Sequence, residues 1–116
     1  MSEKPDPFYT LIPDDGRGAR YDLKIDSVNV GTCIILEYPS KDAIAVWSLE
    51  IYPSFRGLGH GKAMIDAICG IARGKSLKRV WLRVDKDNDV AISMYTKQGF
   101  KVVAEYPEDL AMERQA

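Results

Sequence analysis

The chain has 116 residues, of which 46% are hydrophobic and 28% charged, and a chain of this length buries about two-thirds of its unfolded surface around one core. We expect one domain, 1–116, with a tail or short first strand over 1–20 and the core over 21–114. The 16 basic and 17 acidic residues nearly cancel, so no global field draws the protein to nucleic acid or to an anionic membrane. With no apolar run near the ~18 residues of a membrane span and no signal-peptide core, the expected location is cytoplasmic.

The first half of the chain predicts strands. Residues 1–20 contain three of the six prolines, a loop composition, and only Phe8 to Ile12 is expected to form a short strand there. Alternating or continuous apolar residues then predict three longer strands: 21–25, 33–38 and 43–51. Asn29 to Gly31 is the expected hairpin turn between the first two of these, and Pro53 ends the third.

The second half alternates helices with strands. A helix is predicted from about Gly61, with apolar residues at the 3.6-residue period and Gly74 closing it. Asn88 is a suitable N-cap for a second helix, with Gly99 as its C′ residue. Further strands are expected at 80–84, 101–105 and 110–114. Because a strand, a helix and a strand in succession form parallel pairs, the fold class is a mixed α/β sheet.

The segment Arg56-Gly57-Leu58-Gly59-His60-Gly61-Lys62 stands between a predicted strand and a predicted helix. Its three glycines let the main chain turn tightly and approach a ligand without a Cβ in the way. The unpaired amides and the positive dipole end of the following helix favour an anion, most readily a phosphate. The segment is therefore a candidate phosphate-binding loop.

Two common phosphate loops do not fit this segment. A P-loop needs Gly-x4-Gly-Lys-Ser/Thr, whereas Gly57 and Gly61 are one residue too close and Ala63 offers no hydroxyl. A dinucleotide fingerprint needs Gly-x-Gly-x-x-Gly and a later acidic residue, whereas the glycines here have the wrong spacing.

A third pattern, Arg-x-x-Gly-x-Gly, is matched by Arg56, Gly59 and Gly61. Downstream stands a second pattern, Leu82-Arg83-Val84-x3-Asn88-x2-Ala91-x3-Tyr95-x3-Gly99-Phe100. In this order the two patterns resemble the acyl-CoA loop and the following strand and helix of the GNAT N-acetyltransferase superfamily, over about residues 21 to 114. The resemblance implies a GNAT-like fold, acetyl-CoA as cofactor and an amine-bearing small molecule or peptide as acceptor.

The resemblance also implies a cofactor site. The strands 43–51 and 80–84 would be parallel and splayed apart around the pantetheine arm, with main-chain groups near Ile51 pairing with its amides and Arg56 beside the pyrophosphate. The amides from Leu58 to Ala63 would hold that pyrophosphate. The implied cofactor residues are Ile51, Arg56, Gly57, Leu58, Gly59, His60, Gly61, Lys62, Ala63 and Asn88. Asn88 can equally be only a helix cap, and Arg56 only a loop charge.

Two residues are candidates for the chemistry. By resemblance, Tyr95 holds the position from which family members protonate the leaving thiolate, as a phenol with a pKa near 10 can do; the alternative is a core aromatic. The acceptor ammonium must lose a proton, and Glu50, the only acid between Ala43 and Arg56, is the candidate base. Its alternative is a surface glutamate.

Other residues point away from further chemistry. Cys33 and Cys69 are expected to be buried small hydrophobes, so the transfer would be direct, in a ternary complex. A single histidine without nearby cysteines predicts no metal site. The basic cluster at Arg73, Lys75, Lys78 and Arg79 either meets the cofactor's 3′-phosphate or is only a charged turn.

The front of the chain departs from the family. GNAT domains usually carry a strand and two helices before the hairpin, and those helices build much of the acceptor site, yet only about 20 residues precede Tyr21 here. We expect a compact variant whose acceptor site is open or completed by a homodimer. The competing interpretation is a non-catalytic CoA sensor or partner-binding module on the same fold.

Overall fold

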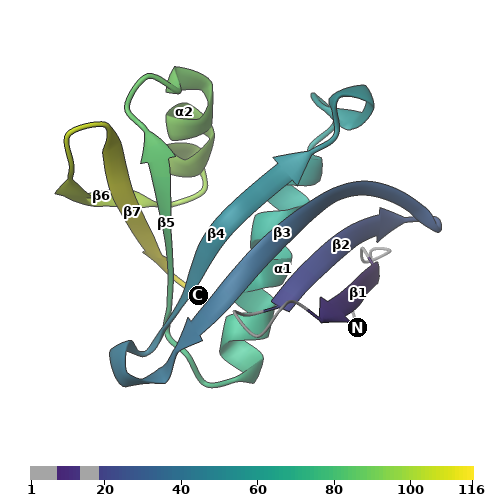
Figure 1. Ribbon diagram of the computed structural model, residues 1–116, viewed down its shortest axis with the longest axis horizontal. Helices are drawn as coiled ribbons and strands as arrows, with labels where there is room; N and C mark the ends of the chain where they lie inside the picture. The colour runs from purple at the N-terminus through teal and green to yellow at the C-terminus, as the bar shows by residue number, and fades with distance from the viewer. Residues whose placement is uncertain (1–7, 14–18) are drawn as a thin grey trace.

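The computed structural model describes residues 8–13 and 19–116 (Figure 1). In this part of the chain, seven strands form one sheet in the order β1-β2-β3-β4-β5-β7-β6. The strands are β1 Phe8–Pro13, β2 Ala19–Ile25, β3 Val28–Tyr38, β4 Ala43–Ile51, β5 Arg79–Asp85, β6 Lys101–Glu105 and β7 Asp109–Gln115. The helices are α1 His60–Gly74 and α2 Asp89–Lys97, with short 3₁₀ turns η1 Pro39–Lys41 and η2 Pro53–Phe55.

The sheet is mixed, as the sequence predicts. β4 and β5 are parallel, and every other pair of neighbours is antiparallel. The parallel pairing extends only from Ala43 opposite Arg79 to Val46 opposite Leu82. Beyond Val46 the two strands diverge, which Figure 1 shows as a widening angle between β4 and β5. The expectation of splayed parallel strands is therefore confirmed.

The hydrophobic core lies between the sheet and α1, which runs behind β3 and β4 in Figure 1. One face of α1 is buried, with Met64, Ile65, Ile68, Cys69 and Ala72 at its centre. Ile44 and Val46 of β4 belong to the same cluster. Both cysteines are free and buried, as predicted. Neither helix in the described residues is long and apolar enough to cross a membrane.

A β-bulge interrupts β4 at the point where it leaves β5. Ile34 of β3 lies opposite Ser48 and Ile35 lies opposite Val46, so Trp47 has no partner in β3. A bulge bends its strand and increases its local twist. The parallel ladder with β5 ends at the residue before this bulge, so the bulge coincides with the divergence.

One turn prediction was wrong. The β2–β3 turn is formed by Asp26 and Ser27, whose φ values of 51° and 70° give the positive φ at both positions that a two-residue type I′ hairpin needs. Gly31 instead lies buried within β3, where a Cβ would stand 2.5 Å from the carbonyl oxygen of Glu50. α1 ends at Gly74, as predicted, and the left-handed residue after the helix is Ser76, with φ 61°.

Candidate active site where β4 and β5 diverge

The glycine loop is shaped by two left-handed residues. Gly57 and Gly59 have φ values of 79° and 86°, and a Cβ on either would meet nothing within 4 Å. The requirement for glycine at these positions is therefore conformational, because left-handed backbone is costly for other L-residues. Gly59 is also the N-cap of α1. The predicted loop-to-helix junction is confirmed.

This loop presents a run of free backbone donors. Among the described residues, the N–H groups from Gly57 to Lys62 have no acceptor. The Ala63 amide, expected in the same set, donates instead to the Gly59 carbonyl at 3.1 Å, and this is a correction. The free amides stand at the positive end of the α1 dipole, where an anion is stabilised.

The charged residues around the loop have contacts of their own. Arg56 Nε donates to the Ile51 carbonyl at 2.8 Å, which ties the loop to the end of β4 and occupies the carbonyl that pantetheine was expected to use. Lys62 Nζ lies 2.9 Å from Asp66 Oδ2 in an exposed pair, a weak interaction in water. The His60 ring lies 6.5 Å from that of Phe55, while Leu58 is 66% exposed.

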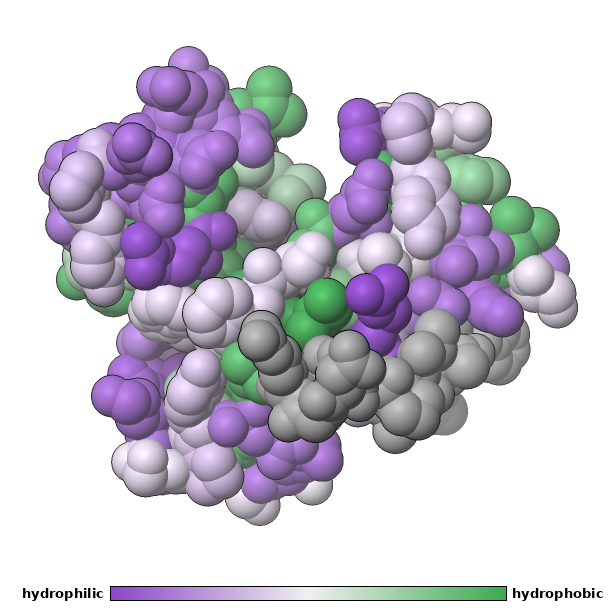
Figure 2. Space-filling model, in the orientation of Figure 1, coloured by the Kyte–Doolittle hydropathy of each residue, from purple (hydrophilic) through white to green (hydrophobic). Residues whose placement is uncertain are grey.

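A cavity of about 230 Å³ opens between the diverging strands. It is lined by Val46, Trp47, Ser48, Leu49, Leu82, Arg83, Val84, Asp85, Asn88, Ala91 and Tyr95. Figure 2 shows the same place from outside as a notch between the lobe that carries α2 and the lobe that carries the end of β4. Two of the predicted site residues, Asn88 and Tyr95, thus come together in one cavity.

Tyr95 is held by the end of its own helix. Gly99, with φ 96°, reverses the chain so that the Phe100 N–H donates to the Tyr95 carbonyl at 3.0 Å and the Gly99 N–H donates to the Thr96 carbonyl at 3.1 Å. This is a Schellman motif, and it confirms Gly99 as the C′ residue. The Phe100 ring packs edge-on against Tyr95, with 5.5 Å between ring centroids.

The environment of Tyr95 keeps its hydroxyl protonated. The residue is 8% exposed, and burial raises its pKa above the ordinary value of 10.0, because a phenolate is poorly stabilised away from water. Among the described residues the hydroxyl has no hydrogen-bond partner. Tyr95, which lines the cavity, therefore carries an O–H donor that no described residue engages.

Asn88 both caps a helix and lines the cavity. Its side-chain oxygen accepts a hydrogen bond from the Ala91 N–H at 3.1 Å, which confirms the predicted N-cap of α2. Because Asn88 also lines the cavity, the two roles that the sequence offered for it are compatible.

Glu50 does not join this arrangement. It is exposed on β4 opposite Thr32 of β3 and is not among the residues that line the cavity. Sequence reasoning missed Trp47, Ser48 and Asp85, which do line it. Trp47 and Ser48 lie at the bulge, and the sequence carries no local signal for a bulge other than its apolar pattern changing phase after Val46.

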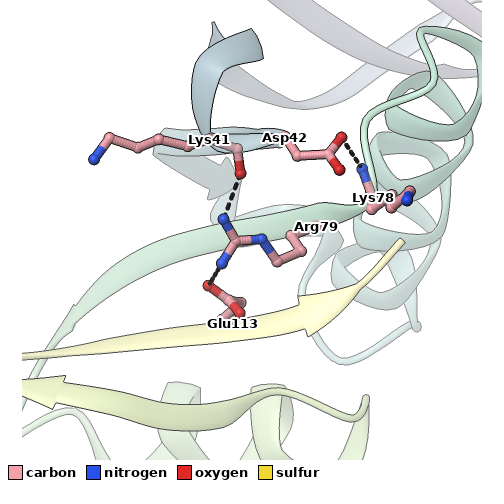
Figure 3. Close-up of polar contacts among 5 residues, drawn as sticks. All are labelled: Lys41, Asp42, Lys78, Arg79 and Glu113. Carbon is pink, nitrogen blue, oxygen red and sulfur yellow. Dashed lines mark hydrogen bonds and ion pairs between the residues drawn. The ribbon is translucent and has the colours of Figure 1, made fainter.

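The basic cluster stands at the other end of α1, a helix of 15 residues and so about 22 Å long. Lys75 Nζ pairs with Glu37 at 2.9 Å. Arg79 donates to Glu113 at 3.0 Å and to the Lys41 carbonyl, and the Lys78 N–H donates to Asp42 at 3.2 Å (Figure 3). These contacts fasten the starts of β4 and β5 to each other and to β7, far from the glycine loop, which favours the charged-turn interpretation.

Within residues 8–13 and 19–116, no group of three or more His, Cys, Asp or Glu side chains is placed to hold a metal ion.

Comparison with known proteins decides the family. Residues 2–100 match the model of the acetyltransferase (GNAT) family. The chain belongs to this family. It is 38% identical over 55 residues to a mycothiol acetyltransferase of Geodermatophilus obscurus, covering 47% of this chain and 18% of that protein. It is 30% identical over 84 residues to an uncharacterized N-acetyltransferase of Mycobacterium tuberculosis, covering 72% of this chain and 51% of that protein.

The GNAT fold is also shown by solved structures. A GNAT family acetyltransferase from Elizabethkingia anophelis, solved with acetyl-CoA bound, superposes with a TM-score of 0.77 over 86% of this chain and 77% of that one, at 14% identity. The chain thus spans about half, or less, of the length of the two curated relatives, while it covers most of this structural neighbour.

Proposed function

We propose that this GNAT protein is an acetyl-CoA-dependent N-acetyltransferase that acts on a primary amine by direct attack in a ternary complex. The observation that carries the proposal is that free backbone N–H donors of the glycine loop and a cavity between β4 and β5 occur in the same site. The unpaired amides of the glycine loop stand at the start of α1, and the cavity between the splayed strands is lined by Tyr95. The names of the relatives, acetyltransferases in each case, support the same reaction class.

The residues present fit the phosphate and pantetheine parts of coenzyme A. The amides of Gly57, Leu58, Gly59, His60, Gly61 and Lys62 would bind the pyrophosphate, with the α1 dipole adding to them. Arg56 supports this loop through its bond to Ile51 and adds positive charge. Strand β4 beyond Val46 lacks its β5 partner, so its main-chain groups on that side, other than the Ile51 carbonyl that Arg56 holds, would be available to the pantetheine arm, with Asn88 across the cavity.

Side chains of the protein would then donate and accept the protons that the reaction transfers. Acetyl-CoA supplies an acyl group activated as a thioester. The amine forms a C–N bond to the acyl carbon, the C–S bond breaks, and the Tyr95 O–H gives its proton to the departing thiolate sulfur. The acceptor nitrogen loses a proton, for which we propose Glu50 as base. Because Glu50 lies outside the cavity lining, this transfer would run through water.

A specific observation supports the alternative of a CoA-binding sensor. Only residues 14–18 separate β1 from β2, a length below that of a single average helix, whereas the two helices expected between these strands build much of the acceptor site in related domains. The presence of Tyr95 in the cavity lining favours the enzyme, because a sensor does not need a proton donor there.

Calorimetric titration of the purified protein with CoA and acetyl-CoA tests the cofactor site. We expect binding in the micromolar range that is lost in Gly59→Asp, because the new carboxylate would repel the pyrophosphate. Gly74→Asp is the matched control, since it adds the same charge at the far end of α1, where a Cβ meets nothing within 4 Å, and should bind normally. Absence of binding by the native protein would refute the proposal.

A further inference from the structure

A second and larger hollow lies on the face of the sheet opposite α1. Its volume is about 550 Å³, and it is lined by Tyr38, Lys41, Ala43, Ala45, Trp47, Arg79, Trp81, Tyr106 and Glu113. Side chains alternate along a strand, so the burial of Ile44 against α1 places Ala43 and Ala45 on this other face. Both alanines are buried, and their small side chains form the floor of the hollow, which we name the alanine groove.

The alanine groove joins the cavity between β4 and β5. Trp47 lines both spaces, and it is 62% exposed although it is a large apolar side chain. Because β5 leaves β4 after Val46, no strand in the part of the chain that the structure describes closes the groove beyond Trp47. A molecule lying in the groove would therefore point one end at the cavity that contains Tyr95.

The walls of the groove are aromatic. Two tryptophans and two tyrosines, Tyr38, Trp47, Trp81 and Tyr106, stand around the alanine floor. Tyr106 is held in place by Arg83, whose guanidinium lies 3.9 Å from the ring centroid. Such walls bind a flat apolar body by burial and by stacking between rings.

The charges of the groove argue against a polycation. Among the described residues Glu113 is the only carboxylate in its lining, and Arg79 already binds it at 3.0 Å (Figure 3). Lys41 and Arg79 are cationic lining residues, so the groove has no net negative charge to offer. An acceptor with several ammonium groups would meet like charge there, whereas an acceptor with a single ammonium can place it at the Trp47 end, over an aromatic face.

The register sets the length of the acceptor. Ala45 lies opposite Trp81, and Trp47 is two residues further along the strand, a distance of about 7 Å. A ring stacked over Ala45 beside Trp81, with a short aliphatic linker, would bring its amine toward the opening of the cavity at Trp47. We propose that the acceptor is a primary amine attached to an aromatic ring by a short aliphatic linker. This inference rests on the proposed N-acetyltransferase function.

A panel of amines tests the inference, with thiol release from acetyl-CoA as the readout. The panel holds tryptamine and phenethylamine as aromatic amines, with spermidine, kanamycin and a glycine-rich tetrapeptide as competitors. We expect kcat/KM for the aromatic amines to exceed that of each competitor by at least about tenfold, which an apolar pocket can achieve. A preference for spermidine, kanamycin or the tetrapeptide would overturn the inference.

Two variants locate the effect in the groove. Ala45→Leu fills the floor and should raise KM for tryptamine at least about tenfold without changing the dissociation constant of CoA. Ala67→Leu, on α1 and outside both hollows, is the matched control and should change neither. Tyr106→Ala, a surface change, should also raise KM for tryptamine. Unchanged KM in both groove variants would overturn the inference.

A measurement of CoA binding distinguishes failure of the proposed aromatic acceptor from failure of the proposed function. If the native protein binds CoA but acetylates none of the aromatic amines, the aromatic acceptor is refuted while the CoA site stands. If it does not bind CoA at all, the proposed function fails and the inference fails with it.

Discussion

Replacing Tyr95 by phenylalanine separates a catalytic hydroxyl from a packing ring. The ring stays, so its edge-on contact with Phe100 at 5.5 Å is retained. The hydroxyl has no partner among the described residues, so no hydrogen bond within this part of the chain is lost. We therefore expect the free energy of unfolding to change by less than about 1 kcal/mol, and the melting temperature by less than about 8 °C.

The expected effect on the rate is much larger. A positioned general acid contributes about a hundred- to ten-thousandfold, which corresponds to about 3–5 kcal/mol of barrier. Because burial raises the pKa of Tyr95 above 10.0, its hydroxyl stays protonated through pH 9. The ratio of native to variant kcat should therefore be constant from pH 7 to pH 9.

Three measurements check this prediction: kcat by thiol release, CoA affinity by calorimetry and thermal melting. Tyr52→Phe, at a half-buried tyrosine outside both hollows, is the control for loss of a phenol. The reasoning is refuted if Tyr95→Phe keeps kcat within about threefold of the native value while CoA binding and melting are also unchanged. That result would favour the sensor.

Three further predictions concern stability and the cofactor. Asn88→Ala should lose about 1 kcal/mol of stability with the cap and also weaken CoA binding, whereas Asn88→Asp should keep the cap; normal CoA binding by both would leave Asn88 a cap only. Gly31→Ala should destabilise by about 1–3 kcal/mol, because its Cβ would stand 2.5 Å from the Glu50 carbonyl; an unchanged urea midpoint would contradict this. Burial raises the pKa of the Cys33 thiol from 9.0 to about 11. As pH rises, the thiol therefore loses its proton in the unfolded chain at a lower pH than in the folded protein. The free energy of unfolding should be unaffected below pH 9 and fall by up to about 3 kcal/mol between pH 9 and 11. Urea titrations over this pH range should show a smaller fall for Cys33→Ala than for the native protein.

Much of the fold follows from local sequence patterns. β4 and β6 begin and end at the predicted residues, because an apolar run bounded by turn residues is a strong strand signal. The cap at Asn88 and the reversal at Gly99 were equally predictable, since each depends on one residue type. The β2–β3 turn was not, because Asp26 and Ser27 adopt the left-handed conformation while the usual turn residues, Asn29 and Gly31, lie within β3.

The site was only partly predictable for a different reason. The loop amides and Tyr95 belong to contiguous motifs, whereas the alanine groove is assembled across strands from β3, β4, β5 and β7. Apolar side chains on both faces of 43–46, followed by Trp47 and later by Trp81, are the signal that could have found it. Glu50 was chosen because it is the only acid in its segment, a criterion that carries no information about distance to the cavity.

The bulge at Trp47 affects how the residues of β4 alternate between the two faces of the sheet. Without Trp47, the residues of β4 would alternate regularly, with Val46, Leu49 and Ile51 toward the core and Ser48 and Glu50 away from it. The strand therefore behaves as a regular amphipathic segment into which one residue has been inserted, and the insertion leaves the core-facing set intact. The strand thus accommodates one extra residue beside the cavity, and the β3–β4 ladder loses a single paired position.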